Sequence, residues 1–126
     1  FIQVFSHKVY PQYFDDQKGS WMSKNFFTGG MMPYDGFYKK LNSNLENIEV
    51  WKLSGHNYHR SLESWLSNFK LNKKIILRDM DENGYGKERA KHFNRYKLFL
   101  IFCSELFNYR DGGEWYIIHY LFKKRN

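Results

Sequence analysis

The order of the hydrophobic patterns along this chain of 126 residues predicts an α/β fold. Residues 115–122 are almost all aromatic or β-branched, which is typical of a central strand that is buried on both faces. Residues 47–53 place successive apolar side chains on opposite faces of a second strand. Residues 62–69 carry apolar side chains at a spacing of three and four, which indicates a helix. Strands and helices therefore alternate along the chain.

The chain opens with a predicted strand over residues 1–6, which has apolar side chains on both faces and which we interpret as buried. The sequence begins in the middle of this pattern, without an initiator Met or a targeting segment, so we expect it to start inside a larger domain. A loop is predicted over residues 7–19, because Pro11 and several polar residues interrupt the pattern. Three strands leave both edges of an α/β sheet unprotected, so the sheet is expected to continue upstream.

Two short helices are expected between the first and second strands. Ser20 is expected to N-cap a helix over residues 21–27, which Thr28-Gly29-Gly30 ends. Residues 31–33 form a second predicted loop. Asp35 is expected to cap another short helix in the residues that follow it.

Two longer helices are expected after the second strand. Ser61 is expected to cap a helix that runs to about Arg78, with Glu63 in its first turn, where the helix dipole favours a carboxylate. Residues 81–86 form a predicted turn. The second long helix is predicted over residues 87–108.

The second half of that last helix is unusually apolar. Residues 98–103 are apolar all round, so this part of the helix is expected to be buried on every side. A turn at residues 111–113 leads to the strand 115–122, which we expect in the middle of the sheet because both of its faces are apolar. Lys123-Lys124-Arg125 is expected to end that strand in solvent.

Charge and composition narrow the classes of function. The chain has 20 Lys and Arg against 13 Asp and Glu, a formal net charge of +7. The basic residues are scattered, so we expect no nucleic-acid partner, while a peripheral contact between a basic face and phospholipid head groups stays open. No run of about 18 apolar residues exists, so nothing is expected to span a membrane. A single Cys excludes a disulfide framework and favours a reducing, cytoplasmic location.

Residue types alone point to no metal site. Of the histidines, only His56 and His59 lie within one turn of each other, and we interpret that pair as part of a surface loop. Cys103 lies in the apolar helix and is interpreted as an inert core thiol. Glu105 is either a helix-surface carboxylate or a site residue, and spacing does not decide which. The aromatics between residues 21 and 38 form either core under a loop or an apolar lid over a substrate pocket.

Four stretches of the chain match motifs of one known family. They are, in order, Trp21-Met22 with residues 26–33 (WM…FFTGG-x-MP in the family), Trp51 with residues 55–66 (HW…G-x-HY-x-R-T-x-E-x-W), residues 104–109 (AELFGY) and residues 114–124 (EW…HYLFKK). They span nearly the whole chain in the family's own order, so together they specifically resemble the cyclopropane-fatty-acyl-phospholipid synthase superfamily.

The branch that looks most similar holds the plant coclaurine N-methyltransferases, which are class I, Rossmann-like enzymes that use S-adenosyl-L-methionine (SAM). The resemblance implies that residues 1–126 are the C-terminal, substrate-capping half of such a domain, and that the cofactor-binding half is not in this chain. It implies three strands with an antiparallel last strand inserted between the other two, plus a helical substrate lid. The fragment alone is then expected to be inactive and to bind SAM poorly.

The resemblance assigns site residues unevenly. Tyr58 matches a tyrosine that helps to hold a bicarbonate base in the cyclopropane synthases. Gln3 stands where the family has a catalytic His or Glu, and because Gln cannot act as a base, this departure counts against carrying over either mechanism. Cys103 matches a cysteine near the pocket. We expect the carboxyl end of the first strand, the substrate lid, Tyr58 and Cys103 to converge on one cavity, because open α/β sheets bind ligands at the carboxyl ends of their strands. The expected lid residues are Phe26, Phe27, Gly29, Gly30, Met32 and Pro33.

The sequence therefore predicts part of a SAM-dependent methyltransferase. Its acceptor is either an amine nitrogen or a lipid alkene, so its partner is a small molecule or a phospholipid, and the second choice implies a role in lipid biosynthesis. The alternative is a non-catalytic remnant or binding module that keeps half of a methyltransferase fold.

Overall fold

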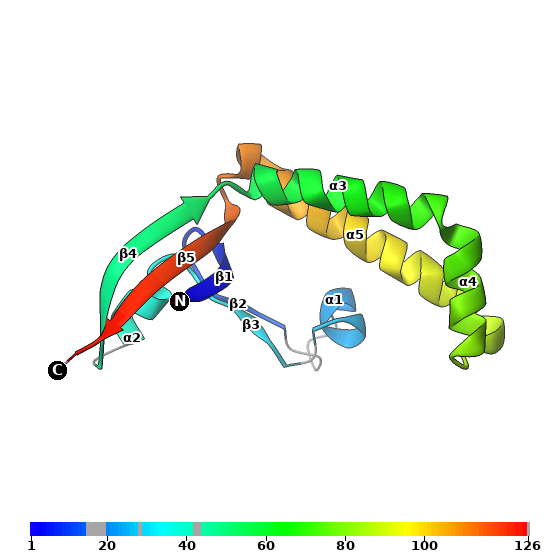
Figure 1. The fold of residues 1–126 in the computed structure, drawn as a ribbon, viewed down its shortest axis with the longest axis horizontal. Helices are drawn as coiled ribbons and strands as arrows, with labels where there is room; N and C mark the ends of the chain where they lie inside the picture. The colour runs from blue at the N-terminus through cyan, green and yellow to red at the C-terminus, as the bar shows by residue number, and fades with distance from the viewer. Residues whose placement is uncertain (15–19, 28, 42–43, 126) are drawn as a thin grey trace.

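The molecule has a sheet at one end and a long helical arm that extends away from it (Figure 1). The computed structural model describes residues 1–14, 20–27, 29–41 and 44–125. In the arm, α3 (Gly55–Leu71) runs beside α5 (Arg89–Gly112), and α4 (Lys73–Glu82) with the 3-10 turn η1 (Gly86–Glu88) joins them at the far end. The predicted α/β class is confirmed. The loop expected over residues 15–19 and the helix stop at Thr28 lie outside the described residues.

β5 (Trp115–Lys124) is the central strand of the main sheet, as its apolar pattern predicted. It pairs antiparallel with β1 (Ile2–His7) on one side and with β4 (Leu45–Leu53) on the other. The order β1-β5-β4 is therefore the one that the resemblance implied. Ile118 and Tyr120 are fully buried, because both neighbouring strands and the packed side chains cover β5.

β1 is less buried than the sequence predicted. Ser6 and His7 at its carboxyl end are fully buried, but Phe1 is 71% exposed and Phe5 is 37% exposed. The expectation of burial on both faces is therefore wrong. Phe5 stays partly open because it borders a cavity, where its ring packs against Tyr58 at a centroid distance of 4.9 Å.

Two segments that were predicted as loops form a small second sheet. β2 (Gln12–Tyr13) pairs antiparallel with β3 (Met31–Met32). Strands of this length show no hydrophobic periodicity, so the loop predictions missed them. Backbone hydrogen bonds from Phe14 to Gly30 and from Gly29 to Phe14 extend the same pairing.

α1 (Trp21–Asn25) falls between β2 and β3 along the chain. The N-cap prediction for Ser20 is confirmed, because its Oγ accepts the backbone N–H of Ser23. Met22 on this helix is buried against the helical arm, where it joins a cluster with Leu62 and Phe107. The short helix is therefore anchored by packing as well as by its cap.

The segment around α2 (Phe37–Leu41) is bonded to the main sheet. Asp35, expected as the cap of α2, instead accepts a hydrogen bond from the Tyr116 hydroxyl at 2.9 Å and forms an ion pair with Lys52. Burial and, after it, the bond to Asp35 raise the pKa of Tyr116, so this hydroxyl keeps the proton that it donates. The cap prediction is wrong because the carboxylate meets partners on β5 and β4.

α3 begins well before the predicted start. Ser54 is its N-cap, with its Oγ accepting the backbone N–H of His56 at 3.2 Å. Ser61, the predicted cap, lies inside the helix, where its hydroxyl donates to a backbone carbonyl one turn earlier at 3.3 Å. Glu63 is therefore in the body of α3 and not in its first turn.

Gly55 explains the early start of α3. A Cβ at this position would lie 2.1 Å from the Trp115 carbonyl oxygen and 2.5 Å from that of Phe107. Only glycine lets the helix begin this close to the backbone of α5 and β5. The sequence pattern alone treated Gly55 as the end of a strand, so it placed the helix too late.

α5 is covered by α3 along one side only. Cys103, Ser104 and Phe107 are buried on it, but Leu98 is 50% exposed and Phe102 is 46% exposed. The expectation that residues 98–103 are buried on every side is therefore wrong, because an apolar helix is buried only where another element covers it. No described helix is long and apolar enough to cross a bilayer.

The long helices also end differently from their predicted bounds. The helix predicted to run to Arg78 stops at Leu71, and α4 restarts after Asn72. At the end of α5, Arg110 and Asp111 adopt left-handed backbone conformations with φ of 50° and 56°. This turn brings the chain from the arm back to β5.

Candidate functional site

A cavity of about 460 Å³ lies beside the carboxyl end of β1, between the small sheet and the helical arm. Its size is typical of a small-molecule site, and its lining is mostly aromatic. Residues that follow β1, together with Phe5 on it, form one wall, and α3 and α5 form the opposite wall. The lining residues are Phe5, Tyr10, Pro11, Gln12, Tyr13, Phe14, Ser20, Met22, Phe27, Met32, Tyr58, Phe99, Phe102, Cys103, Leu106 and Phe107.

Tyr58 reaches this cavity from the first turn of α3, which the Ser54 cap and Gly55 position. Its ring packs against Phe5 and Phe107 at centroid distances of 4.9 and 4.8 Å. Burial, and to a smaller extent the neighbouring Cys103, raises the pKa of the Tyr58 hydroxyl. The hydroxyl is therefore neutral at physiological pH and can donate a hydrogen bond into the cavity.

Cys103 lies on α5 at the same cavity. Burial raises the pKa of its thiol to about 11, so the thiolate is scarce near neutral pH. This property agrees with the interpretation of Cys103 as an unreactive thiol. Tyr58 and Cys103, which the resemblance paired, do line one cavity.

The predicted lid residues divide among three positions. Phe27 and Met32 line the cavity. Together with Gly30 and Pro33 they also line an adjoining space of about 190 Å³. Phe26 lies behind the lining, stacked on Phe99 at a centroid distance of 4.4 Å.

Gly29 and Gln3 line neither space. The backbone N–H of Gly29 donates to Phe14, so its described contact is to the small sheet. Gln3 is exposed and lies opposite His119 in the sheet, nearer the start of β1 than the cavity is. The structure therefore brings Tyr58, Cys103, Phe27 and Met32 together and leaves Gln3 apart.

The wall formed by residues 10–14 was not among the predicted site residues. Three aromatic residues in five, Tyr10, Tyr13 and Phe14, could have indicated a cavity wall, but the pattern predicted only a loop. Phe99 also lines the cavity without having been among the predicted site residues, because the apolar pattern around it predicted only a buried helix. Aromatics that border a cavity and aromatics of a core have the same sequence pattern, so only the fold separates them.

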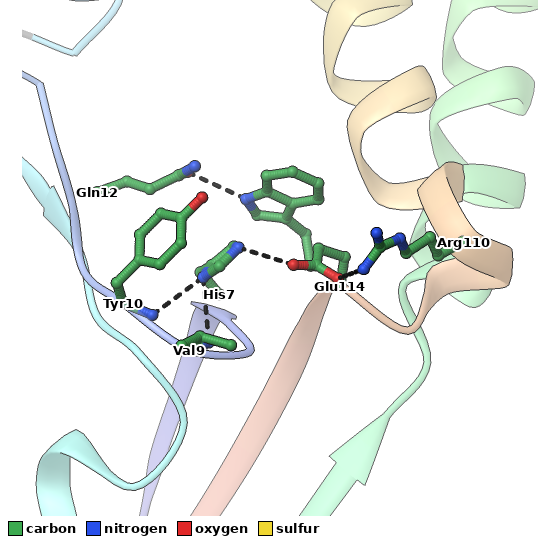
Figure 2. Close-up of polar contacts among 7 residues, drawn as sticks. His7, Val9, Tyr10, Gln12, Arg110 and Glu114 are labelled. Carbon is green, nitrogen blue, oxygen red and sulfur yellow. Dashed lines mark hydrogen bonds and ion pairs between the residues drawn. The ribbon is translucent and has the colours of Figure 1, made fainter.

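A polar cluster stands at the edge of this wall (Figure 2). The fully buried His7 accepts the backbone N–H groups of Val9 and Tyr10 at its Nδ1, both at 3.1 Å. An atom that accepts two N–H groups carries no proton, so the ring proton is on Nε2. That nitrogen lies 3.2 Å from Glu114 Oε1, an ion-pair distance without the angle of a hydrogen bond.

Neighbouring contacts hold this cluster in place. Arg110 donates to Glu114 Oε2 at 3.1 Å, as Figure 2 shows. The Tyr10 ring packs on His7 at a centroid distance of 4.0 Å. The Trp115 indole N–H donates to Gln12 Oε1 at 3.1 Å. Because Tyr10 and Gln12 both line the cavity, the cluster fixes part of its wall.

The chain matches plant N-methyltransferases along almost its whole length, while no family model matches it. It is 30% identical over 131 residues to (S)-coclaurine N-methyltransferase of Papaver somniferum, and 29% identical over 129 residues to N-methyltransferase 4 of the same plant. Both matches cover 99% of this chain but only 37% and 36% of the relatives. The chain therefore spans little more than a third of their length.

A solved structure, coclaurine N-methyltransferase bound to N-methylheliamine and SAH, has the same fold. It aligns with 97% of this chain and 37% of its own at a TM-score of 0.84 and 27% identity. The fold is thus that of a segment of a class I SAM-dependent methyltransferase. Over this segment the chain is similar in sequence and in fold to the coclaurine N-methyltransferases.

Proposed function

We propose that the chain is the C-terminal, substrate-capping part of a SAM-dependent N-methyltransferase, and that residues 1–126 work with an N-terminal part that binds the cofactor. The homologues and the length that they share with the chain support this proposal. When SAM is bound it supplies a methyl group on a sulfonium. The described residues include no strand that leads through a glycine-rich turn into a helix, so they suit the acceptor and not the cofactor.

The aromatic cavity carries the proposal. Methylation turns an amine into a more highly substituted ammonium ion, and the faces of aromatic rings stabilise such cations. The rings of Tyr58, Phe5 and Phe102 line the cavity from two sides. Its volume of about 460 Å³ suits an aromatic amine of moderate size.

The neutral hydroxyl of Tyr58 is proposed to orient the acceptor. It is a polar group among apolar neighbours, so one hydrogen bond to the acceptor would define its direction. Phe27, Met32 and Pro33 would close the cavity, with Phe26 as backing and Gly29-Gly30 as the turn of this lid. Catalysis then consists mainly of holding the acceptor in line with the methyl group.

We assign proton removal from the acceptor to neither Tyr58 nor Cys103. Tyr58 and Cys103 both keep their protons near neutral pH, because burial raises their pKa values. Gln3 has no basic group and is away from the lining. The apolar lining favours a neutral amine, which is the nucleophilic form, so the described part of the chain selects this form by desolvation.

Methylation of a lipid alkene is the second candidate. The match of Tyr58 to the bicarbonate-holding tyrosine of the cyclopropane synthases favours it, and an alkyl chain also suits an apolar cavity. The homologues favour the amine, since all those named above are N-methyltransferases. A peripheral contact with phospholipid belongs to this second candidate.

The test uses the full-length protein with SAM that is isotopically labelled on its methyl group. A panel of secondary aromatic amines is compared with vesicles of unsaturated anionic phospholipid. We expect label on the amine nitrogen, and we expect Tyr58→Phe to lower turnover while Tyr85→Phe, away from the cavity, leaves it unchanged. If only the lipid carries label, the alkene and not the amine is the acceptor. If neither carries label, the result favours a non-catalytic binding module.

A separate experiment tests whether the cofactor binds to the N-terminal part and not to residues 1–126. Calorimetric titration of the 126 residues with SAM is expected to show no binding in the micromolar range. The full-length protein under the same conditions is expected to bind. Micromolar binding to the 126 residues would overturn the proposed division.

A further inference from the structure

His56 and His59 lie at the start of α3. The interpretation of this pair as part of a surface loop is therefore wrong. Their imidazole centroids are 5.5 Å apart with the ring planes at 36°. At the helix start His56 is exposed and His59 is half-buried, and the two flank Tyr58 along the chain. None of the contacts at the cavity uses either ring.

The hydrogen bonds of His59 define its tautomer. Its Nδ1 lies 3.1 Å from the Ser104 carbonyl oxygen and 2.8 Å from the Ser104 hydroxyl oxygen. A carbonyl oxygen only accepts, and the hydroxyl gives its own proton to Glu63 Oε1. Nδ1 is therefore the protonated nitrogen, and Nε2 carries a free lone pair.

His56 has the same tautomer. Its Nδ1 lies 3.0 Å from Asn108 Oδ1, which is an acceptor, so Nδ1 carries the proton and Nε2 the lone pair. Imidazoles that ligate metals commonly donate their other ring N–H to an oxygen acceptor in this way. The Ser104 hydroxyl that His59 contacts is itself hydrogen-bonded to the Glu63 carboxylate, which makes Nε2 of His59 a stronger metal ligand.

The spacing of the rings fits a shared ion. Two imidazoles bound through Nε2 to one tetrahedral ion, at a metal–nitrogen distance of about 2.1 Å, have centroids about 5 Å apart. The observed centroid separation of 5.5 Å is close to this value, so the two rings lie within reach of one ion. Both rings are tethered to α5, so little side-chain freedom remains to be lost on binding.

We propose that His56 and His59 form a two-histidine site for a late first-row divalent metal ion, with water in the remaining positions. Borderline ions such as Cu²⁺ and Zn²⁺ prefer imidazole nitrogen, and Cu²⁺ binds most tightly in the general order of affinities. Within the described part of the chain no group of three or more ligating side chains gathers, so the site is open and of modest affinity. The proposal does not depend on methyl transfer.

Zn²⁺ calorimetry and pulsed electron paramagnetic resonance with Cu²⁺, both on the purified full-length protein, test this site. We expect a resonance signature of two imidazoles on one ion, and at least a tenfold loss of Zn²⁺ affinity in His56→Gln and in His59→Gln. Ser104→Ala, which removes one oxygen partner of His59, is expected to weaken binding by about tenfold. His92→Gln, which changes a histidine on α5 outside the pair, is the matched control and should bind as the parent protein does.

Each outcome decides the proposal. Unchanged Zn²⁺ affinity in both His56→Gln and His59→Gln would overturn it, as would a Cu²⁺ signal from a single imidazole. Circular dichroism shows whether a variant has lost the fold. If a histidine variant does not fold, the number of imidazoles bound to Cu²⁺ in the unaltered protein and the Zn²⁺ affinity of Ser104→Ala still test the proposal.

Discussion

The two walls of the cavity are held in place by different means. On the helical wall, α3 and α5 pack through a buried cluster that includes Leu62 and Phe107, and Gly55 brings α3 against the backbone of β5. The opposite wall consists of Phe5, residues 10–14, Phe27 and Met32. It is held by a small sheet with strands of two residues and by a few hydrogen bonds to His7. The helical wall is therefore the rigid side, and the other wall has the lower local stability, as expected for a lid.

The largest effect on stability is expected from a substitution that disrupts the packing of the rigid wall. In Gly55→Ala the new Cβ would lie 2.1 Å from a backbone oxygen, so α3 must move, and we expect the free energy of unfolding to fall by about 3 kcal/mol. Gly30→Ala is the matched control, because Gly30 is hydrogen-bonded to Phe14 of the opposite wall. Its Cβ would meet Phe14 at an ordinary 3.7 Å, so a change of about 1 kcal/mol or less is expected. Equal losses in urea unfolding would contradict the difference between the walls.

Tyr58→Ala also acts on the helical wall. Removing the ring from between Phe5 and Phe107 leaves a cavity, and we expect a loss of about 3 kcal/mol in stability. Tyr58→Phe keeps the ring and should cost about 1 kcal/mol or less. Normal turnover in Tyr58→Phe would make this residue purely structural.

His7 tests the other wall. His7→Leu leaves the buried N–H groups of Val9 and Tyr10 without an acceptor, and we expect a loss of about 2 kcal/mol. His7→Asn places an amide oxygen near the position of Nδ1, so it should recover most of that loss. Because Tyr10 lines the cavity, KM for the acceptor should rise more than kcat falls. A His7→Asn variant as unstable as His7→Leu would argue against the role of Nδ1 as acceptor.

The effect that is smallest near neutral pH concerns Cys103. Its thiol has a pKa raised by burial to about 11 from an ordinary value of 9.0, so between these values the folded protein keeps a proton that the unfolded chain loses. Stability is therefore expected to be unaffected near pH 7 and to fall as the pH rises from about 9 to about 11. Alkylation by iodoacetamide at pH 8 should be much slower in the folded than in the urea-unfolded protein. Equal rates would show an accessible thiolate.

The sequence was a good guide where a pattern is long and local. The run of eight residues from Trp115 onward, apolar except for His119, predicted the central strand, and Ser20 predicted a cap. It failed where a residue acts through a distant partner. Gly55 looked like a strand end because its close neighbours belong to α5 and β5, and Asp35 looked like a cap because its partners Tyr116 and Lys52 lie far along the chain.

The cavity was predicted in part. Of the residues expected to converge on it, Tyr58, Cys103, Phe27 and Met32 line it, while Phe26, Gly29, Gly30 and Pro33 do not, and the roles of all of them in binding stay predictions. The contact between His7 and Glu114 joins opposite ends of the sequence and leaves no spacing signal. Other lining residues, such as Tyr10, are aromatics whose pattern is that of any core.

The central claim is that an aromatic amine occupies the cavity between the two walls. A crystal structure of the full-length protein with SAH and a secondary aromatic amine tests it most directly. We expect the rings of the amine between Tyr58 and Phe102, with its nitrogen toward the carboxyl end of β1. An amine bound elsewhere while this cavity holds a lipid chain, or remains without ligand, would contradict the account.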